Sequence, residues 1–173
     1  MLHHVSVGVA DVSRAAEFYD AVLGALGYKR TAQYLPYAIA YGEGVSEFWI
    51  QLPHDKESPG AGNGAHYGFR AKNQNAVHRF HETALENGAR DDGAPGPRAD
   101  YGPDYYGAFV FDPFGNKIEA VFIAGETKAR GRAASGAKSS RKAATKRAPA
   151  RKAKVKAKTK RAGAAKNRKA RRR

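Results

Sequence analysis

The chain repeats its own sequence pattern at a fixed shift of 62 residues. A repeat at constant spacing is typical of a duplicated supersecondary unit, so this feature restricts the fold to two copies of one small motif. Each copy begins with a histidine, and two histidines in equivalent positions can converge on one metal ion. The matched positions are His4 and His66, Asp11 and Asn73, Phe18 and Phe80, Asp20 and Glu82, and Leu23 and Leu85.

The charge of the chain changes sharply near residue 127. All 16 acidic residues lie at or before Glu126, and residues 1–127 carry a net charge of −6. Residues 128–173 contain no acidic residue and carry +21, with one valine and no Leu, Ile or aromatic residue. Such a segment buries too little apolar surface to offset its chain entropy. The sequence therefore predicts a folded domain over residues 1–125 and a disordered Lys/Arg/Ala-rich tail over residues 126–173.

The residue types that are absent exclude several classes of protein. The chain has no cysteine, which excludes disulfides, thiolate metal sites and a cysteine nucleophile. No stretch approaches the roughly 20 apolar residues of a membrane-spanning helix. The N-terminus also lacks the layout of a secretory signal. We expect a cytoplasmic protein, associated with the nucleoid if the tail binds DNA.

Hydrophobic alternation and helical spacing predict a βαβββ unit in each copy, and hence an α+β fold. Ser13 is expected to cap the first helix and Gly27 to end it. The first unit, about residues 1–53, is predicted to contain a strand over 2–10, a helix over 14–26 and strands over 28–34, 37–42 and 47–52. The second unit, about residues 64–124, is predicted to contain a strand over 65–71, a helix over 74–87 and strands over 89–92, 105–111 and 116–123.

Four polar residues lie at the ends of the two units. His4 and His66 fall in the first strands, and Gln51 and Glu119 interrupt apolar runs in the last strands. A pseudo-twofold axis between the copies could bring the four side chains to a common centre. Imidazole and carboxylate donors suit Fe, Ni, Co, Mn or Zn. The alternative is a set of hydrogen-bonded structural residues; Glu119 argues most strongly for a ligand, because a buried carboxylate needs a partner or a metal.

The motifs of the first 124 residues resemble those of the vicinal oxygen chelate superfamily, which includes glyoxalase I, extradiol dioxygenases and resistance proteins of the bleomycin and fosfomycin type. The resemblance implies that the two units form a curved mixed sheet. It also implies a divalent metal site with ligands at His4, Gln51, His66 and Glu119. The motifs are His4-Val5, Val9-Ala10-Asp11, Ala16-Glu17-Phe18-Tyr19, Val22-Leu23-Gly24 and the run from Phe111 to Glu119.

By this resemblance we expect a metal-dependent enzyme of the lyase or isomerase type. Its substrate would be a small molecule that chelates the metal through adjacent oxygens, with Glu119 as the catalytic base. Gly8 and Asp55 stand where glutathione-using members usually have Arg and Asn, which argues against a glutathione substrate. The resemblance also implies a site that is shared between the two subunits of a homodimer.

Three alternatives remain open. His4, His66 and Glu119 alone would form the two-histidine, one-carboxylate set of an extradiol-type dioxygenase. A metal-free protein that binds a small molecule or confers resistance is the second alternative, and a DNA-associated protein that uses the domain only to dimerise is the third.

Aromatic and cationic residues near the predicted strands are candidates for a substrate pocket. Arg98 could hold an anionic group of the substrate from a loop. The competing interpretation is that the aromatic residues pack within the sheet and that Arg98 is solvated. The pocket candidates are Trp49, Tyr37, Arg98, Tyr101 and Tyr106.

The tail over residues 128–173 resembles the Lys/Ala-rich tails of linker histones. A segment of this charge neutralises phosphates and releases counterions, so it favours DNA or RNA as a partner without sequence preference. RNA alone, an anionic membrane surface or no partner are the alternatives. The absence of aromatic residues argues against single-strand specificity.

Overall fold

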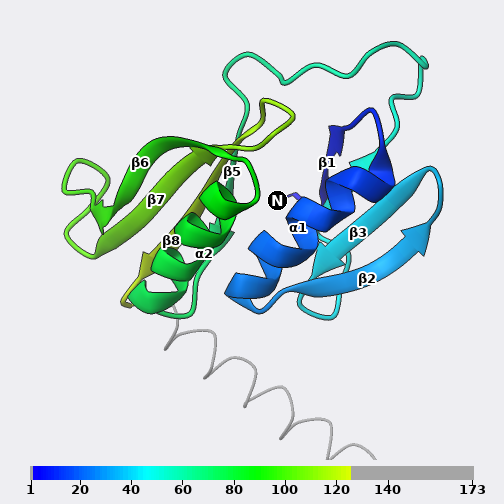
Figure 1. Cartoon of the computed structure of the whole chain (residues 1–173). Helices are drawn as coiled ribbons and strands as arrows, with labels where there is room; N and C mark the ends of the chain where they lie inside the picture. The colour runs from blue at the N-terminus through cyan, green and yellow to red at the C-terminus, as the bar shows by residue number, and fades with distance from the viewer. Residues whose placement is uncertain (1, 126–173) are drawn as a thin grey trace, which may run out of the picture. The chain divides into compact units, whose positions relative to one another are not determined.

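The computed structural model describes residues 2–125, which form two βαβββ units (Figure 1). This confirms the predicted fold class; the tail predicted from residue 126 onward lies outside the described residues. The first unit contains β1 (Val5–Gly8), α1 (Val12–Leu26), β2 (Lys29–Tyr34), β3 (Ala38–Gly42) and β4 (Phe48–Gln51). The second contains β5 (His66–Arg70), α2 (Gln74–Glu86), β6 (Arg90–Pro97), β7 (Tyr105–Phe111) and β8 (Lys117–Ile123).

Each unit has a four-stranded mixed sheet with the same strand order. The orders are β1-β4-β3-β2 and β5-β8-β7-β6. The first and last strands of a unit pair in parallel, and the other pairs are antiparallel. Residues of β5 therefore lie directly beside residues of β8, which is the arrangement that a site built from the first and last strands requires.

Both helices begin at matched positions of the repeat. Oδ1 of Asp11 accepts hydrogen bonds from the backbone N–H groups of Ser13 at 2.8 Å and Arg14 at 3.0 Å, so Asp11 is the N-cap of α1. The prediction of Ser13 as the cap was wrong, because the chain is still extended at Asp11 and Ser13 already lies in the first helical turn. Asn73 caps α2 in the same way. Gly27 ends α1 with a φ of 93°, as predicted.

One strand is longer than the sequence predicts. β6 runs from Arg90 to Pro97, whereas the prediction ended at residue 92. Its pairing with β7 is interrupted by register shifts on either side of Gly93. Glycine and proline normally end a strand, but these irregularities accommodate them here. Because the segment is rich in both residues, the sequence pattern did not predict a strand beyond residue 92.

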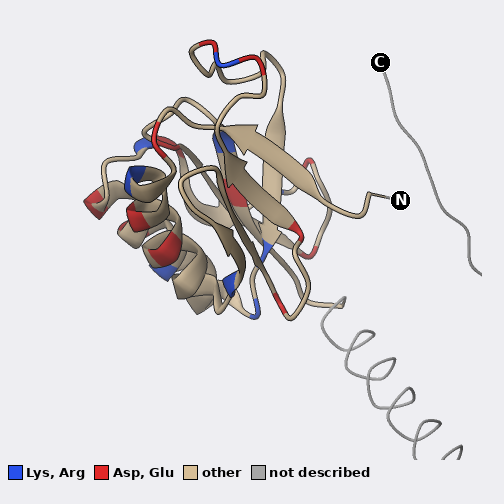
Figure 2. Cartoon of the chain, turned by 90° about the vertical axis from the view of Figure 1, so that its right-hand side faces the viewer, with Lys and Arg blue, Asp and Glu red and all other residues tan. Residues whose placement is uncertain are grey.

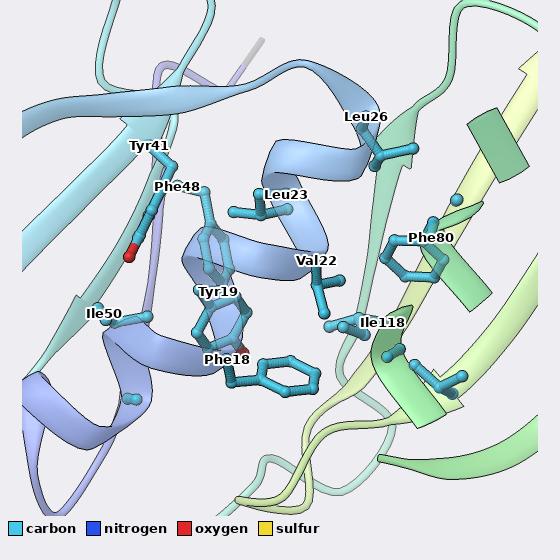
Figure 3. Close-up of a cluster of buried hydrophobic side chains, with 14 of the residues drawn as sticks. Phe18, Tyr19, Val22, Leu23, Leu26, Tyr41, Phe48, Ile50, Phe80 and Ile118 are labelled. Carbon is cyan, nitrogen blue, oxygen red and sulfur yellow. The ribbon is translucent and has the colours of Figure 1, made fainter. Parts of the chain in front are cut away.

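The core lies between the helices and the sheets and is continuous through both units. The two helices pack against each other, and a view turned by 90° shows them on one side of the strands (Figure 2). α1 directs Tyr19 and Leu23 toward the sheet of its own unit and Val22 toward Ile118 of the other unit (Figure 3). Rings also meet across the units, with Phe48 of β4 5.0 Å from Phe69 of β5. Neither helix within residues 2–125 has the length and apolar character that crossing a bilayer requires.

Candidate functional site

Glu119 lies on the side of the second sheet that faces away from the helices. In β8, its neighbours Ile118 and Ala120 belong to the core, so alternation turns Glu119 to the opposite side, here called the open face. Despite this position its residue surface is only 3% exposed. A carboxylate that is buried on an otherwise accessible face needs partners that stabilise its charge.

Glycines on the two neighbouring strands make room for the Glu119 side chain. Gly68 of β5 is its Cα partner, and Gly107 of β7 lies diagonally across from it, opposite Val121. A Cβ atom on Gly107 would lie 2.7 Å from Oε1 of Glu119, and one on Gly68 would lie 3.4 Å from Oε2. The carboxylate therefore occupies a depression that larger residues would fill.

Two side chains hold the carboxylate within this depression. The hydroxyl of Tyr105 donates a hydrogen bond of 2.7 Å to Oε1, and Nε2 of His66 lies 3.3 Å from Oε2. Burial raises the pKa of Glu119, and this rise is partly offset by the Tyr105 hydrogen bond and by the nearby His66, Arg98 and Lys117. His66 and Glu119 thus lie in contact, and their role as metal ligands stays a prediction.

Phe109 forms a wall beside the carboxylate. It is the Cα partner of Glu119 on β7, and its ring lies 5.6 Å from the His66 ring. Phe109 and Lys117 were not among the predicted site residues. The period-two alternation of β7 and β8 could have identified both, because it places them on the same face as Glu119.

The open face of the first unit is aromatic. Trp49 of β4 stacks on Tyr34 at a ring distance of 6.2 Å, and the His4 ring lies 6.5 Å from Trp49. His4 is exposed and immediately precedes β1, whereas the sequence predicted it inside a strand over residues 2–10. Tyr37 is also exposed and lies in the turn between β2 and β3.

The strand register changes the counterpart of Glu119 in the first unit. The backbone N–H of Val9 donates to the carbonyl of Gln51 at 2.9 Å, and its equivalent Ala71 donates to Val121 at 2.7 Å. Gln51 therefore matches Val121, and Trp49 matches Glu119. Gln51 remains a predicted ligand, but the pseudo-twofold relation supports an indole rather than an amide at the position equivalent to Glu119.

The remaining pocket candidates divide between the two faces of the second sheet. Tyr101 lies on the open face, with its ring 5.2 Å from Tyr105 and 6.4 Å from Phe109. Cζ of Arg98 lies 5.3 Å from the centroid of the Phe109 ring. Tyr106 lies on the opposite face, where its hydroxyl is 2.7 Å from Nε2 of His78 on α2 and where it packs against the core.

The four predicted metal ligands are not all brought together. Across residues 2–125 no group of three or more His, Asp or Glu side chains is placed to hold a metal ion. His66 and Glu119 fit as a pair of ligands, because an imidazole nitrogen and a buried carboxylate face each other over 3.3 Å. The other donors of a complete site would have to come from the first unit of another copy or from the substrate.

A cavity of about 850 Å³ lies between the two units, and His66 is part of its lining. Leu23, Leu26 and Phe48 from the first unit form part of its apolar lining. His66, Gly68 and Tyr105 lie where it meets the open face of the second sheet. A small molecule entering there would contact the core edge and three residues that flank Glu119, namely His66, Gly68 and Tyr105.

Comparison with known proteins agrees with this architecture. A family model described as the Glyoxalase/Bleomycin resistance protein/Dioxygenase superfamily matches residues 1–120. A glyoxalase/bleomycin resistance protein from Albidiferax ferrireducens T118 is 34% identical, with a TM-score of 0.63; the match covers 70% of this chain and 97% of that chain.

More distant structures share the fold. A glyoxalase/bleomycin resistance protein/dioxygenase family enzyme from Burkholderia phytofirmans PsJN is 20% identical with a TM-score of 0.55, and the match covers 69% of this chain and 96% of that chain. A glyoxalase-related enzyme from Fulvimarina pelagi is 17% identical with a TM-score of 0.56, and the match covers 70% of this chain and 87% of that chain. None of the curated proteins compared matches the chain. On its family match and its 34% identical relative, the chain belongs to the glyoxalase/bleomycin resistance protein/dioxygenase superfamily.

Proposed function

We propose that the domain is a metal-dependent enzyme of the lyase or isomerase type, with Glu119 as its catalytic base. The observation that carries this proposal is the buried Glu119 carboxylate, which lies 3.3 Å from His66 in a glycine-lined depression. A base buried in this way has a raised pKa and is poised to exchange a proton with a substrate.

The proposed metal ligands are His66 and Glu119 together with His4 and Gln51. A bound divalent metal would act as a Lewis acid on two neighbouring oxygens of the substrate. Glu119 would accept a proton from the carbon beside those oxygens and return it to the adjacent carbon. Tyr105 would hold Oε1 of Glu119 in position, and Phe109 would exclude water from one side.

The exposure of His4 and its position beside β1 support the proposal that a second copy of the chain supplies His4 to the site. His4 and its neighbour Trp49 lie on the open face of the first unit, and no described contact joins them to His66 or Glu119 of the same chain. A homodimer that places one copy's first unit against the other copy's second unit would complete the site.

The extradiol-type dioxygenase is the second candidate function. The register supports it, because Trp49 rather than a ligand stands at the position equivalent to Glu119. That leaves His4, His66 and Glu119 as a two-histidine, one-carboxylate set, which is typical of non-haem iron oxygenases.

Isotope exchange and oxygen consumption separate the two candidates. In D₂O, a lyase or isomerase should exchange the carbon-bound proton of a 2-hydroxy ketone, and Glu119→Gln should slow this by at least about 100-fold with metal retained. A dioxygenase should instead consume oxygen with catechol. Retention of either activity by a His4→Ala/His66→Ala double variant would contradict the assignment of the site.

We also propose that residues 128–173 bind DNA or RNA through their charge of +21. Affinity for a short duplex should fall steeply and linearly on a log–log plot against salt concentration. A chain ending at residue 127 should lose this binding and keep the chemistry of the domain. Salt-sensitive binding that survives the truncation would place the nucleic-acid contact in the domain instead.

A further inference from the structure

Charged side chains of the second unit converge on Phe109. Cζ of Arg98 and Nζ of Lys117 each lie 5.3 Å from the centroid of its ring, within the range of a cation–π contact. Phe109 is also the Cα partner of Glu119 and a neighbour of the His66 ring. Two cations therefore share one aromatic wall with the candidate base.

Arg98 is held in place by the backbone of β6. Its Nη2 donates to the carbonyl of Ala94 at 2.7 Å, and its Nη1 donates to the carbonyl of Pro97 at 3.2 Å. A Cβ atom on Gly93 or Gly96 would lie 3.2 Å from the guanidinium, so both glycines provide the space that it occupies. A guanidinium fixed in this way loses little freedom when it binds a ligand.

The charges of the two cations are balanced differently. Nζ of Lys117 pairs with Oδ2 of Asp92 at 2.8 Å. Arg98 forms no direct ion pair among residues 2–125, although its charge acts on the nearby Glu119. Its hydrogen bonds go to neutral carbonyls. A guanidinium has more N–H donors than these two bonds use. The remaining N–H donors of Arg98 therefore favour an anion beside it, and Lys117 contacts the same Phe109 ring.

We propose that Arg98 and Lys117 form an oxyanion subsite beside Glu119 and that the substrate carries a carboxylate or a phosphate group. This inference rests on the proposal that Glu119 and His66 form the reaction site. Arg98 would bind two oxygens of the group through paired N–H donors, and Lys117 would add a point charge. The subsite would fix the end of the substrate that does not react.

Residue-resolved NMR of the full chain tests this inference with three probes of one shape. Benzoate and phenyl phosphate carry the two candidate anions, and benzamide is a neutral control. The backbone amide signals of Gly107 and Phe109 should shift and saturate with at least one of the two anions and remain unchanged with benzamide. The anion that binds more tightly identifies the group. Anions that bind the basic tail would shift the tail signals and leave these two unmoved.

Matched variants assign the binding to the two cations. Arg98→Gln should weaken anion binding by about tenfold or more, because it removes a charge-assisted pair of hydrogen bonds. Arg98→Lys should recover part of the affinity, and Lys117→Gln should weaken it less. Arg14→Gln is the matched control, because Arg14 is an exposed residue of α1 in the first unit.

Two outcomes would overturn the subsite. Either no anion shifts the Gly107 and Phe109 signals of the wild-type chain, or the affinity is the same in Arg98→Gln and Lys117→Gln as in wild type. The spectrum of each variant also reports whether it is folded. Metal content, measured on the same samples, keeps the two proposals separate: anion binding through Arg98 without metal contradicts the metal site alone, and metal without anion binding contradicts the subsite alone.

Discussion

The hydroxyl of Tyr105 lies 2.7 Å from Oε1 of Glu119 and donates a hydrogen bond to it. Both residues are on the open face, and His66 approaches the second carboxylate oxygen. The carboxylate is therefore held at both oxygens by side chains of its own sheet. A base whose position is fixed before the substrate arrives needs little reorganisation during the reaction.

Glu119→Gln should stabilise the metal-free domain at neutral pH and have a smaller effect in acid. The folded-state pKa of Glu119 is raised above its ordinary 4.5, mainly by burial. A group with a raised folded pKa contributes stability below its unfolded pKa and loses it as pH rises through the folded pKa. Glutamine does not ionise and escapes this loss.

The measurement is thermal unfolding of both proteins with chelator at about pH 4 and about pH 7.5. The difference in Tm, variant minus wild type, should be more positive at the higher pH. A difference that does not change with pH would show that Glu119 is not strained by its burial.

Alanine at the glycines around Glu119 should displace the carboxylate in a graded way. Gly107→Ala should destabilise the domain by about 1–3 kcal/mol and weaken metal binding, because its Cβ would lie 2.7 Å from Oε1. Gly68→Ala, with a contact of 3.4 Å, should have a milder effect. Gly60→Ala is the control, since nothing lies within 4 Å of its added Cβ. Urea unfolding and metal titration measure the loss of stability and of metal affinity in the three variants. Equal losses in Gly107→Ala and Gly60→Ala would contradict the conclusion that Gly107 makes room for the Glu119 carboxylate.

Asp112→Ala should be strongly destabilising. Oδ1 of Asp112 accepts hydrogen bonds from the N–H groups of Phe114 and Asn116, and Oδ2 accepts from the Asn116 side chain and from the Tyr19 hydroxyl of the other unit. Leaving these buried donors unpaired should cost about 3 kcal/mol or more. Tyr19→Phe removes one of these bonds and should cost about 1–2 kcal/mol. Chemical unfolding measures both, and a smaller loss for Asp112→Ala than for Tyr19→Phe would contradict the network.

Pattern reading of the sequence found the repeat and the two units, and it placed His66 and Glu119 among four candidate ligands. Alternation and capping are local signals, so they locate strands and helix ends to within a few residues. The register of β4 is not a local signal, because it depends on how β1 pairs with this strand. The sequence therefore suggested Gln51 as the counterpart of Glu119, whereas the strand pairing makes Trp49 its counterpart.

The rest of the site depended on contacts between strands. Tyr105 and Tyr106 are adjacent and chemically identical, yet one reaches Glu119 and the other reaches His78. The two tyrosines differ in the face of β7 from which their side chains project. The role of Gly107 was likewise invisible, because its missing side chain matters only once the position of the Glu119 carboxylate is known.

Mixing two inactive variants should restore part of the site if a second copy supplies His4. A His4→Ala homodimer and a His66→Ala homodimer would each lack one ligand in both sites. In the mixed dimer one site would keep His4 from one copy and His66 from the other, while its second site would lack both. Metal content of mixtures after subunit exchange measures this. No recovery, with exchange demonstrated by native mass spectrometry, would place His4 and His66 of one chain in the same site or in none.

The most direct test of the central claim is the metal content of the full chain purified without chelator, beside His66→Ala and Arg90→Gln. The account predicts about one divalent metal ion per site in wild type and in Arg90→Gln, and loss of that metal in His66→Ala, which removes a ligand. Metal absent from all three proteins even after reconstitution, or retained in His66→Ala, would contradict a metal site at His66 and Glu119.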